Sequence, residues 1–175
     1  SMKKIKIVVV GLGYVGLSNA LLLAKKNSVT AVDIDIDKIT LINDRKSHLL
    51  DQEIDSFLTN EILDIKATLP LNAGYENSDI VLISTPTNYD EKTNCFNTNS
   101  VETTIKNALS KNPNITIIIR STIPVGFTDQ MIERYQTNEI YFVPEFLREG
   151  KALNDSFNPS RIIIGGSGNK FKLIE

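Results

Sequence analysis

The stretch KIVVVGLGYVG, residues 6–16, decides the fold of this chain. A β-branched apolar run leads into the pattern G-x-G-x-x-G, and a helix-prone run follows at once. In such a pattern Gly11 allows a tight turn, Gly13 allows a pyrophosphate to approach the main chain, and Gly16 allows the helix to pack close to the sheet. The first N–H groups of the helix and the positive end of its dipole then bind an anion without a basic side chain. The stretch predicts a dinucleotide-binding site.

Glycine clusters also occur in ordinary turns, so the following sequence has to support this interpretation. A second predicted strand, residues 29–32, ends in Asp33. The Asp33 carboxylate is placed to accept hydrogen bonds from the adenosine ribose hydroxyls, and its charge repels a 2'-phosphate. Lys38 softens that repulsion. We expect NAD rather than NADP as the cofactor.

Lys3 and Lys4 before a long apolar run imitate a secretory signal or a membrane span. The three glycines interrupt the apolar helix that either would need, no small-x-small cleavage pattern follows, and the next segment is charged. No other apolar run has the length of a membrane span. We therefore expect a cytoplasmic protein without membrane association, and Ser1 before Met2 reads as a cloning scar.

Length and composition favour one domain, residues 1–175, since 175 residues with 41% hydrophobic content form one core and are too few for two full domains. The net charge of -2, without a basic run interleaved with aromatic residues, argues against nucleic acid as a partner. A single cysteine, Cys95, and a single histidine, His48, exclude a disulfide framework and make a His/Cys metal site implausible. The carboxylates of Asp33, Asp35 and Asp37 fit a strand end that leads into a helix cap, so we expect no metal.

Apolar runs alternate with amphipathic stretches, which predicts an α/β fold: a Rossmann-like, doubly wound parallel sheet with helices on both faces. We expect sheet order 3-2-1-4-5-6, with ligands at the carboxyl ends of the strands. Asn99 or Ser100 is the expected cap of the fourth helix. The predicted strands span residues 5–10, 29–32, 67–69, 80–84, 115–120, 140–143 and 161–164, and the predicted helices span residues 15–26, 37–44, 54–63, 100–110 and 128–135.

Hydroxyls, prolines and carboxylates follow three of these strands, in residues 84–88, 120–126 and 144–150. Together with the glycine loop, the motifs GLGYVGL, STPTN, RSTIPVGF and PEFLREG resemble the UDP-glucose/GDP-mannose dehydrogenase family over the whole chain. The STPTNYD loop, together with Pro159, Ser160 and Arg161, is most similar to the branch that acts on UDP-glucose. The resemblance implies an oxidoreductase that uses NAD to oxidise a sugar primary alcohol to a carboxylate in two steps, converting UDP-glucose to UDP-glucuronate.

The resemblance also assigns expected roles to residues. Tyr14 and Val15 match positions that line the cofactor pyrophosphate, and Asp33 and Lys38 match contacts to the adenosine ribose. Thr87 matches a cofactor contact. Thr122 matches a hydroxyl that positions a catalytic water near the nicotinamide. Glu145 and Glu149 match the two carboxylates of the last loop, with Glu149 as the general base. The whole loop segment matches one that meets the sugar nucleotide, and it consists of Glu145, Phe146, Leu147, Arg148 and Glu149.

Without the resemblance, these residues have ordinary interpretations. Glu149 beside Arg148 would be a solvated charge pair, Thr122 a cap or turn residue, and Tyr14 a half-buried packing residue. The chemistry itself favours the functional interpretation, because a second hydride can leave only from a hydrated or covalent adduct of the aldehyde. A carboxylate beside a bound water serves that step as a base.

The chain ends at Glu175, before regions that the resemblance implies: a central helix, through which the full-length protein forms a homodimer, and a second domain with the nucleophilic cysteine. Cys95 lies in a polar predicted loop without a histidine beside it, so we expect an inert thiol. We expect this chain to bind NAD but not to oxidise UDP-glucose alone. Two alternatives stay open: the NAD domain of a dehydrogenase for GDP-mannose or UDP-N-acetylmannosamine, and a non-catalytic NAD-binding module.

Overall fold

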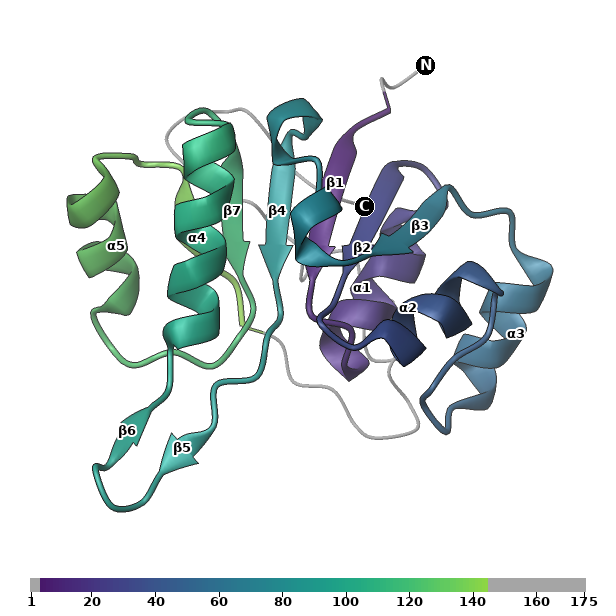
Figure 1. The fold of residues 1–175 in the computed structure, drawn as a ribbon, viewed down its shortest axis with the longest axis horizontal. Helices are drawn as coiled ribbons and strands as arrows, with labels where there is room; N and C mark the ends of the chain where they lie inside the picture. Colours follow the sequence, from purple (N-terminus) through teal and green to yellow (C-terminus); the bar gives the residue numbers. More distant parts are fainter. Residues whose placement is uncertain (1–3, 145–175) are drawn as a thin grey trace.

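A single twisted sheet of six parallel strands organises the computed structural model, which describes residues 4–144 (Figure 1). Its strand order, β3-β2-β1-β4-β7-β8, is the predicted 3-2-1-4-5-6 once strands outside the sheet are set aside. The predicted strand at 161–164 lies outside the described residues. The strands are β1 (Lys6–Val10), β2 (Ser28–Val32), β3 (Ile65–Thr68), β4 (Ile80–Ile83), β7 (Thr116–Ile119) and β8 (Ile140–Phe142).

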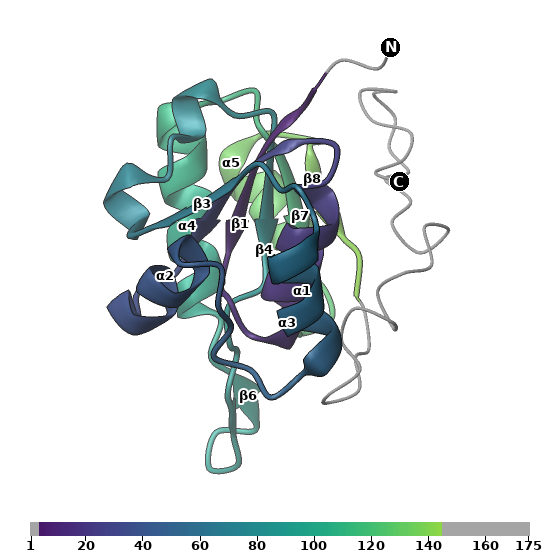
Figure 2. The same cartoon turned by 90° about the vertical axis from the view of Figure 1, so that its right-hand side faces the viewer.

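Helices cover both faces of this sheet, as the alternating apolar pattern predicts. Figure 2 shows α1 and α3 on one side of the sheet and α4 on the other. The side chains of β1 alternate between two buried clusters, since Ile7 and Val9 pack with α1 and α3 whereas Val8 and Val10 pack with α4 and α5. The helices are α1 (Tyr14–Leu23), α2 (Ile36–Asn43), α3 (Gln52–Asn60), α4 (Asn99–Lys111) and α5 (Phe127–Tyr135).

Helix ends differ from the predictions where a polar side chain satisfies the terminal backbone groups. Helix α1 ends at Leu23 rather than at residue 26, and its carbonyl accepts hydrogen bonds from the backbone N–H and the side-chain amide of Asn27 at 2.9 and 3.1 Å. Helix α3 begins earlier than predicted because the Asp51 carboxylate accepts from the N–H groups of its first turn. Asp35 caps α2 in the same way, which confirms the predicted strand end leading into a cap.

Two local predictions are wrong. The residue at the cap position of α4 is Thr98, not Asn99 or Ser100; its side chain accepts from no backbone N–H of the helix, and its hydroxyl donates to the Glu102 carboxylate at 2.7 Å. Cys95 lies on a strand rather than in a loop, because β5 (Tyr89–Asp90) and β6 (Cys95–Phe96) form an antiparallel hairpin that projects beyond the main sheet (Figure 1). Two 3₁₀ turns, η1 (Pro70–Asn72) and η2 (Tyr75–Asn77), precede β4 and were also not predicted.

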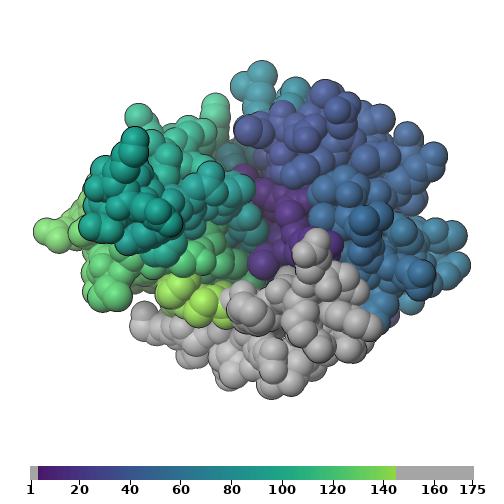
Figure 3. Space-filling model, turned by 90° about the horizontal axis from the view of Figure 1, so that it is seen from below, coloured from purple at the N-terminus to yellow at the C-terminus, as the bar shows by residue number. Residues whose placement is uncertain are grey.

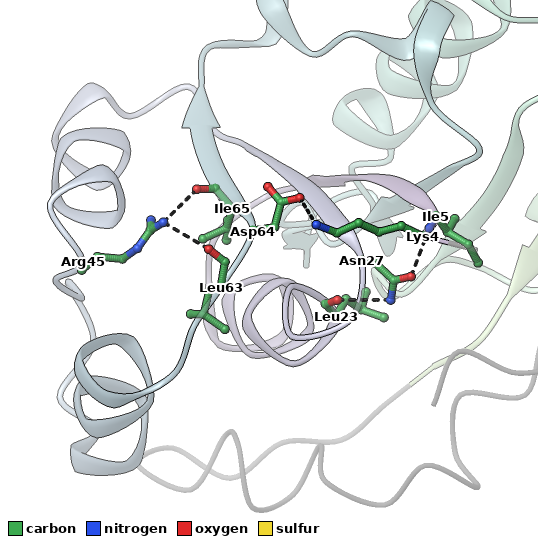
Figure 4. Close-up of polar contacts among 8 residues, drawn as sticks. All are labelled: Lys4, Ile5, Leu23, Asn27, Arg45, Leu63, Asp64 and Ile65. Atoms are coloured by element: carbon green, nitrogen blue, oxygen red, sulfur yellow. Dashed lines mark hydrogen bonds and ion pairs between the residues drawn. The ribbon is translucent and has the colours of Figure 1, made fainter. Parts of the chain in front are cut away.

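Side chains fasten the amino edge of the sheet, where the strands begin (Figure 4). Arg45 donates to the carbonyls of Leu63 and Ile65 at 3.5 and 3.2 Å and so holds the start of edge strand β3 to the end of α2. Lys4 forms an ion pair with Asp64 across the same edge. The Asn27 carboxamide accepts from the N–H that precedes β1, which ties α1 to the strand. Side-chain hydrogen bonds and an ion pair therefore hold the amino edge together, at the end of β1 opposite the glycine loop.

Candidate functional site

The candidate site lies at the opposite edge, where the strands end. Both β1 and β4 point downward in Figure 1, and Figure 3 looks onto their carboxyl ends from below. In that view the purple atoms of the N-terminal segment are set back between teal and blue segments. Strand order reverses between β1 and β4, so this is the switch point at which a doubly wound sheet binds its ligand.

The glycine turn has the geometry that its sequence predicts. Gly11 has φ +95° and donates its N–H to the Val32 carbonyl at 2.8 Å, and a Cβ added to it would meet the Ser84 carbonyl at 2.7 Å. A Cβ on Gly16 would come within 1.6 Å of the Gly11 carbonyl oxygen, so α1 packs against the turn itself. A Cβ on Gly13, by contrast, would have nothing within 4 Å. The turn is closely packed on two sides and open at Gly13.

Helix α1 begins at this open position. Gly13 is its cap residue in an extended conformation, no side chain caps the helix, and its first turn contains no acidic residue. The side chains of Tyr14 and Val15, the first two residues of α1, are half-buried, and Tyr14 packs against the core cluster of the α1 face. An uncapped helix start of this kind favours an anion through its N–H groups and its dipole.

Asp33 connects the end of β2 to the glycine turn. Its Oδ2 accepts from the N–H of Leu12 and its Oδ1 accepts from the N–H of Asp35, both at 2.9 Å. Each carboxylate oxygen has room for a second donor, so these two bonds leave acceptor capacity for a ribose hydroxyl. Lys38, on α2, is half-buried. Besides the predicted role, Asp33 therefore has a structural one, since it fixes the main chain between the first two glycines.

The loops after β4 and β7 meet, as the predicted sheet edge requires. The Thr87 hydroxyl donates to the Thr122 carbonyl at 2.5 Å. The Ser121 hydroxyl donates to the Thr85 carbonyl at 2.7 Å, and Ser100 at the start of α4 donates to the Thr85 hydroxyl at 2.8 Å. The structure thus brings together two predicted site residues, Thr87 and Thr122, and fixes their relative position. Residues Glu145, Phe146, Leu147, Arg148 and Glu149 lie outside the described residues, which end at Pro144, just past β8.

Two polar side chains to which sequence reasoning assigned no individual role have buried polar atoms: Ser84, which lies within the STPTN motif, and His48. The Ser84 hydroxyl, where β4 ends, is buried without a hydrogen-bond partner in the described part of the chain. His48, in the segment between α2 and α3, has two buried ring nitrogens that make no well-formed hydrogen bond there. Burial lowers the pKa of His48 most, and Lys38 lowers it further, while the Leu12 backbone and Asp33 act in the opposite direction. No motif contains His48, so only the folded chain reveals it.

Residues 4–144 contain no group of three histidine, cysteine, aspartate or glutamate side chains that could hold a metal ion. None of the helices in this part of the chain is both long enough and apolar enough to cross a membrane. What the described edge offers is a main-chain cradle for an anion, a carboxylate beside it and a pair of threonines.

Comparisons with known proteins agree with this arrangement. The model of the UDP-glucose/GDP-mannose dehydrogenase family, NAD binding domain, matches residues 5–174. UDP-glucose 6-dehydrogenases of Campylobacter jejuni and Streptococcus pneumoniae are 47% and 46% identical to the chain over 162 and 160 residues, 91% of its length. The chain spans 41% of the length of each of these relatives.

Two solved structures extend the comparison. A UDP-glucose dehydrogenase from Pyrobaculum islandicum superposes with a TM-score of 0.78 over 96% of this chain and 42% of its own, at 23% identity, which supports the fold alone. The UDP-N-acetyl-mannosamine dehydrogenase of Staphylococcus aureus reaches a TM-score of 0.71 at 26% identity, covering 86% of this chain and 38% of its own.

Proposed function

This chain belongs to the UDP-glucose/GDP-mannose dehydrogenase family and matches its NAD-binding domain, and from that premise we propose that it is the cofactor half of an enzyme that oxidises UDP-glucose to UDP-glucuronate. The reaction converts a primary alcohol and one water into a carboxylate, with two hydrides passing to two NAD and three protons released. The two relatives above 45% identity carry the UDP-glucose name, whereas the solved UDP-N-acetyl-mannosamine dehydrogenase shares 26%. UDP-glucose is therefore the favoured substrate.

The observation that carries the proposal is the shape of the glycine turn. Gly11 and Gly16 are filled by neighbouring backbone, and Gly13 at the uncapped start of α1 is open. A dinucleotide phosphate fits this cradle because main-chain N–H groups and the helix dipole supply its binding energy. NAD, when bound, supplies the hydride acceptor. We propose that Gly11, Gly13, Tyr14, Val15 and Gly16 hold its pyrophosphate.

Other residues of this edge would orient the two ends of the cofactor. Asp33 and Lys38 are proposed to bind the adenosine ribose, with Asp33 excluding a 2'-phosphate by charge. Thr87 and Thr122, joined by their hydrogen bond, are proposed to line the nicotinamide end. Thr122 would position a water there. Glu145 and Glu149 remain the proposed carboxylates for substrate contact and base catalysis, and Phe146, Leu147 and Arg148 the proposed substrate contacts between them.

The described residues do not supply a nucleophile for the second oxidation. Cys95, on the projecting hairpin, is exposed, and its thiol donates only to the Thr93 carbonyl at 3.3 Å. We therefore propose that the remaining length of such an enzyme provides the nucleophilic cysteine, most of the UDP-glucose site and the helix through which it forms a homodimer. We further propose that it works in the cytoplasm, where UDP-sugars would reach it.

The test separates binding from turnover. We expect the 175-residue chain to bind NADH, seen as enhanced nicotinamide fluorescence, to bind NADPH more weakly, and to produce no NADH from NAD and UDP-glucose. The full-length protein should then be assayed with UDP-glucose, UDP-N-acetylmannosamine and GDP-mannose. A chain that binds neither dinucleotide contradicts the cofactor assignment, and a full-length protein that prefers GDP-mannose contradicts the substrate assignment.

A further inference from the structure

The loops that follow β4 and β7 lose their backbone pairing at the edge where the cofactor is proposed to bind. The register of the two strands ends with Ile83 opposite Ile119. The Ile83 carbonyl accepts the last two backbone bonds, from the N–H groups of Arg120 and Ser121 at 2.8 and 3.2 Å. Beyond this point, the hydrogen bonds that join the two loops within residues 4–144 come from side-chain hydroxyls. The arrangement of the loops therefore depends on those hydroxyls.

Ser121 supplies one of them. The residue is buried, with 7% of its surface exposed, and its hydroxyl donates to the Thr85 carbonyl at 2.7 Å. A second bond runs in the opposite direction between the same loops, from the Thr87 hydroxyl to the Thr122 carbonyl at 2.5 Å. One bond alone would leave the loops free to rotate about it. Two bonds between different pairs of residues fix both their separation and their relative orientation.

The residues held in this way are those proposed to line the nicotinamide end of the cofactor. Thr122 is exposed and Thr87 is half-buried, so both remain accessible to a ligand, whereas Ser121 is buried. The Ser100 hydroxyl, at the start of α4, holds the same loop from another side by donating to the Thr85 hydroxyl at 2.8 Å. The loop after β4 is thus fixed in the free chain, before any ligand binds.

We propose that Ser121 is a positioning residue for the nicotinamide end of the cofactor: its bond to the Thr85 carbonyl holds the loop after β4 in the conformation that keeps Thr87 beside Thr122. This inference rests on the proposed function, because it takes NAD as the ligand of this edge. Ser121 acts through Thr85 and is not a catalytic residue. A loop that is already held in its binding conformation need not be ordered by the ligand, so the affinity is higher.

The effect is confined to one end of the cofactor. The glycine turn and Asp33, proposed to bind the pyrophosphate and the adenosine ribose, are joined by the bond from the Leu12 N–H, which does not involve Ser121. Loss of the Ser121 hydroxyl should therefore weaken the binding of NADH. It should leave the binding of ADP-ribose, which lacks the nicotinamide, unchanged. A variant that merely loosened the fold would bind both ligands more weakly.

Titration calorimetry of the 175-residue chain with NADH and with ADP-ribose tests this difference. We expect Ser121→Ala to bind NADH about threefold to tenfold more weakly than the wild type, the range that one hydrogen bond spans, and to bind ADP-ribose within about 1.5-fold of it. Ser121→Cys fills nearly the same space but offers only a weak thiol donor, so we expect the same selective loss. Because it preserves the packing, this variant decides the matter if Ser121→Ala does not fold.

Ser78→Ala is the matched control. The Ser78 hydroxyl also donates to a carbonyl, that of Gly74 at 2.8 Å, but it lies ahead of the start of β4, at the amino edge of the sheet. Its removal should lower the midpoint of urea unfolding and change neither the NADH affinity nor the ADP-ribose affinity.

The outcomes also distinguish this inference from the function on which it rests. A wild-type chain that is folded by circular dichroism yet binds neither ligand contradicts the proposed function, and this inference with it. If the wild type binds NADH but the two Ser121 variants bind it equally well, or lose affinity for NADH and ADP-ribose to the same extent, only the role of Ser121 is contradicted. A selective loss of NADH affinity in Ser78→Ala contradicts that role too, since any missing hydroxyl bond would then produce it.

Discussion

Gly16→Ala is the substitution for which the structure gives the clearest expectation. The added methyl would lie 1.6 Å from the Gly11 carbonyl oxygen and 2.8 Å from its carbon, whereas ordinary contacts begin at 3.4 Å. Helix α1 and the turn would have to separate by about 1.8 Å, and both partners are backbone, so no side chain can rotate away. Overpacking usually costs about 1–3 kcal/mol, and we expect a loss at or above the upper end because α1 is packed into the core.

Urea unfolding followed by circular dichroism measures this loss. With a slope of about 1.5–2 kcal/mol per molar urea, a loss of about 3 kcal/mol lowers the midpoint by about 1.5–2 M. Gly13→Ala is the matched control: it adds the same methyl three residues earlier, into open space and at φ −76°, so its stability should change by only about 0.5 kcal/mol or less. A midpoint for Gly16→Ala within about 0.3 M of wild type would refute the packing argument.

The same pair of variants distinguishes the fold from the ligand site. The Gly13→Ala methyl occupies the space proposed for the pyrophosphate, so NADH affinity should fall at least about tenfold, or about 1.4 kcal/mol, although the fold is intact. Normal NADH binding by Gly13→Ala would place the cofactor elsewhere.

Three further changes test single contacts. Asp33→Asn keeps an acceptor for the Leu12 N–H but removes the negative charge. The preference for NADH over NADPH, measured by fluorescence titration, should therefore narrow by about tenfold. An unchanged preference would exclude Asp33 as its source. Thr87→Val removes the hydrogen bond to the Thr122 carbonyl, so the free energy of unfolding measured in urea should fall by about 0.5–1 kcal/mol and NADH binding should weaken. If neither stability nor NADH binding changes, the contact is dispensable. Burial raises the pKa of Tyr75 to about 12. The stability that the protonated Tyr75 contributes is therefore complete below the ordinary tyrosine pKa of about 10 and is lost as the pH rises from there toward 12. Alkaline unfolding of Tyr75→Phe should lack this decline, and a profile identical to that of the wild type would contradict the assignment.

The order of the sheet follows from the sequence because the central strands β1, β4 and β7 are apolar runs in a chain that alternates such runs with helix-forming stretches; edge strand β3, which contains Lys66 and Thr68, is the weakest of these signals. The close packing of the glycine turn follows as well, since a side chain at Gly11 or Gly16 would meet backbone atoms. Even the meeting of Thr87 with Thr122 follows, because parallel strands end at a common edge.

Other features depend on contacts that no local pattern contains. The β5–β6 hairpin has two residues in each strand, too few for an alternating pattern, and an edge-to-face contact of Tyr89 with Phe96 at 5.1 Å supports it. The buried ring nitrogens of His48, in the segment between α2 and α3, belong to no motif and become visible only in the folded chain. The cap position at Thr98 was missed because four polar residues in a row, residues 97–100, are all of types that can cap a helix, and only the backbone conformation selects among them.

The division of the sheet into two edges has a practical consequence for handling the molecule. Chain entry into β1 and the Lys4–Asp64 pair lie at the amino edge, with the glycine turn at the other end of the same strand (Figures 1 and 4). A chain attached to a sensor surface through its amino terminus would therefore present the proposed cofactor entrance to the solution. Attachment through Cys95, the exposed thiol of the hairpin beyond the carboxyl edge, would instead turn that entrance toward the support. Comparing the two orientations in surface plasmon resonance would measure how open the entrance is.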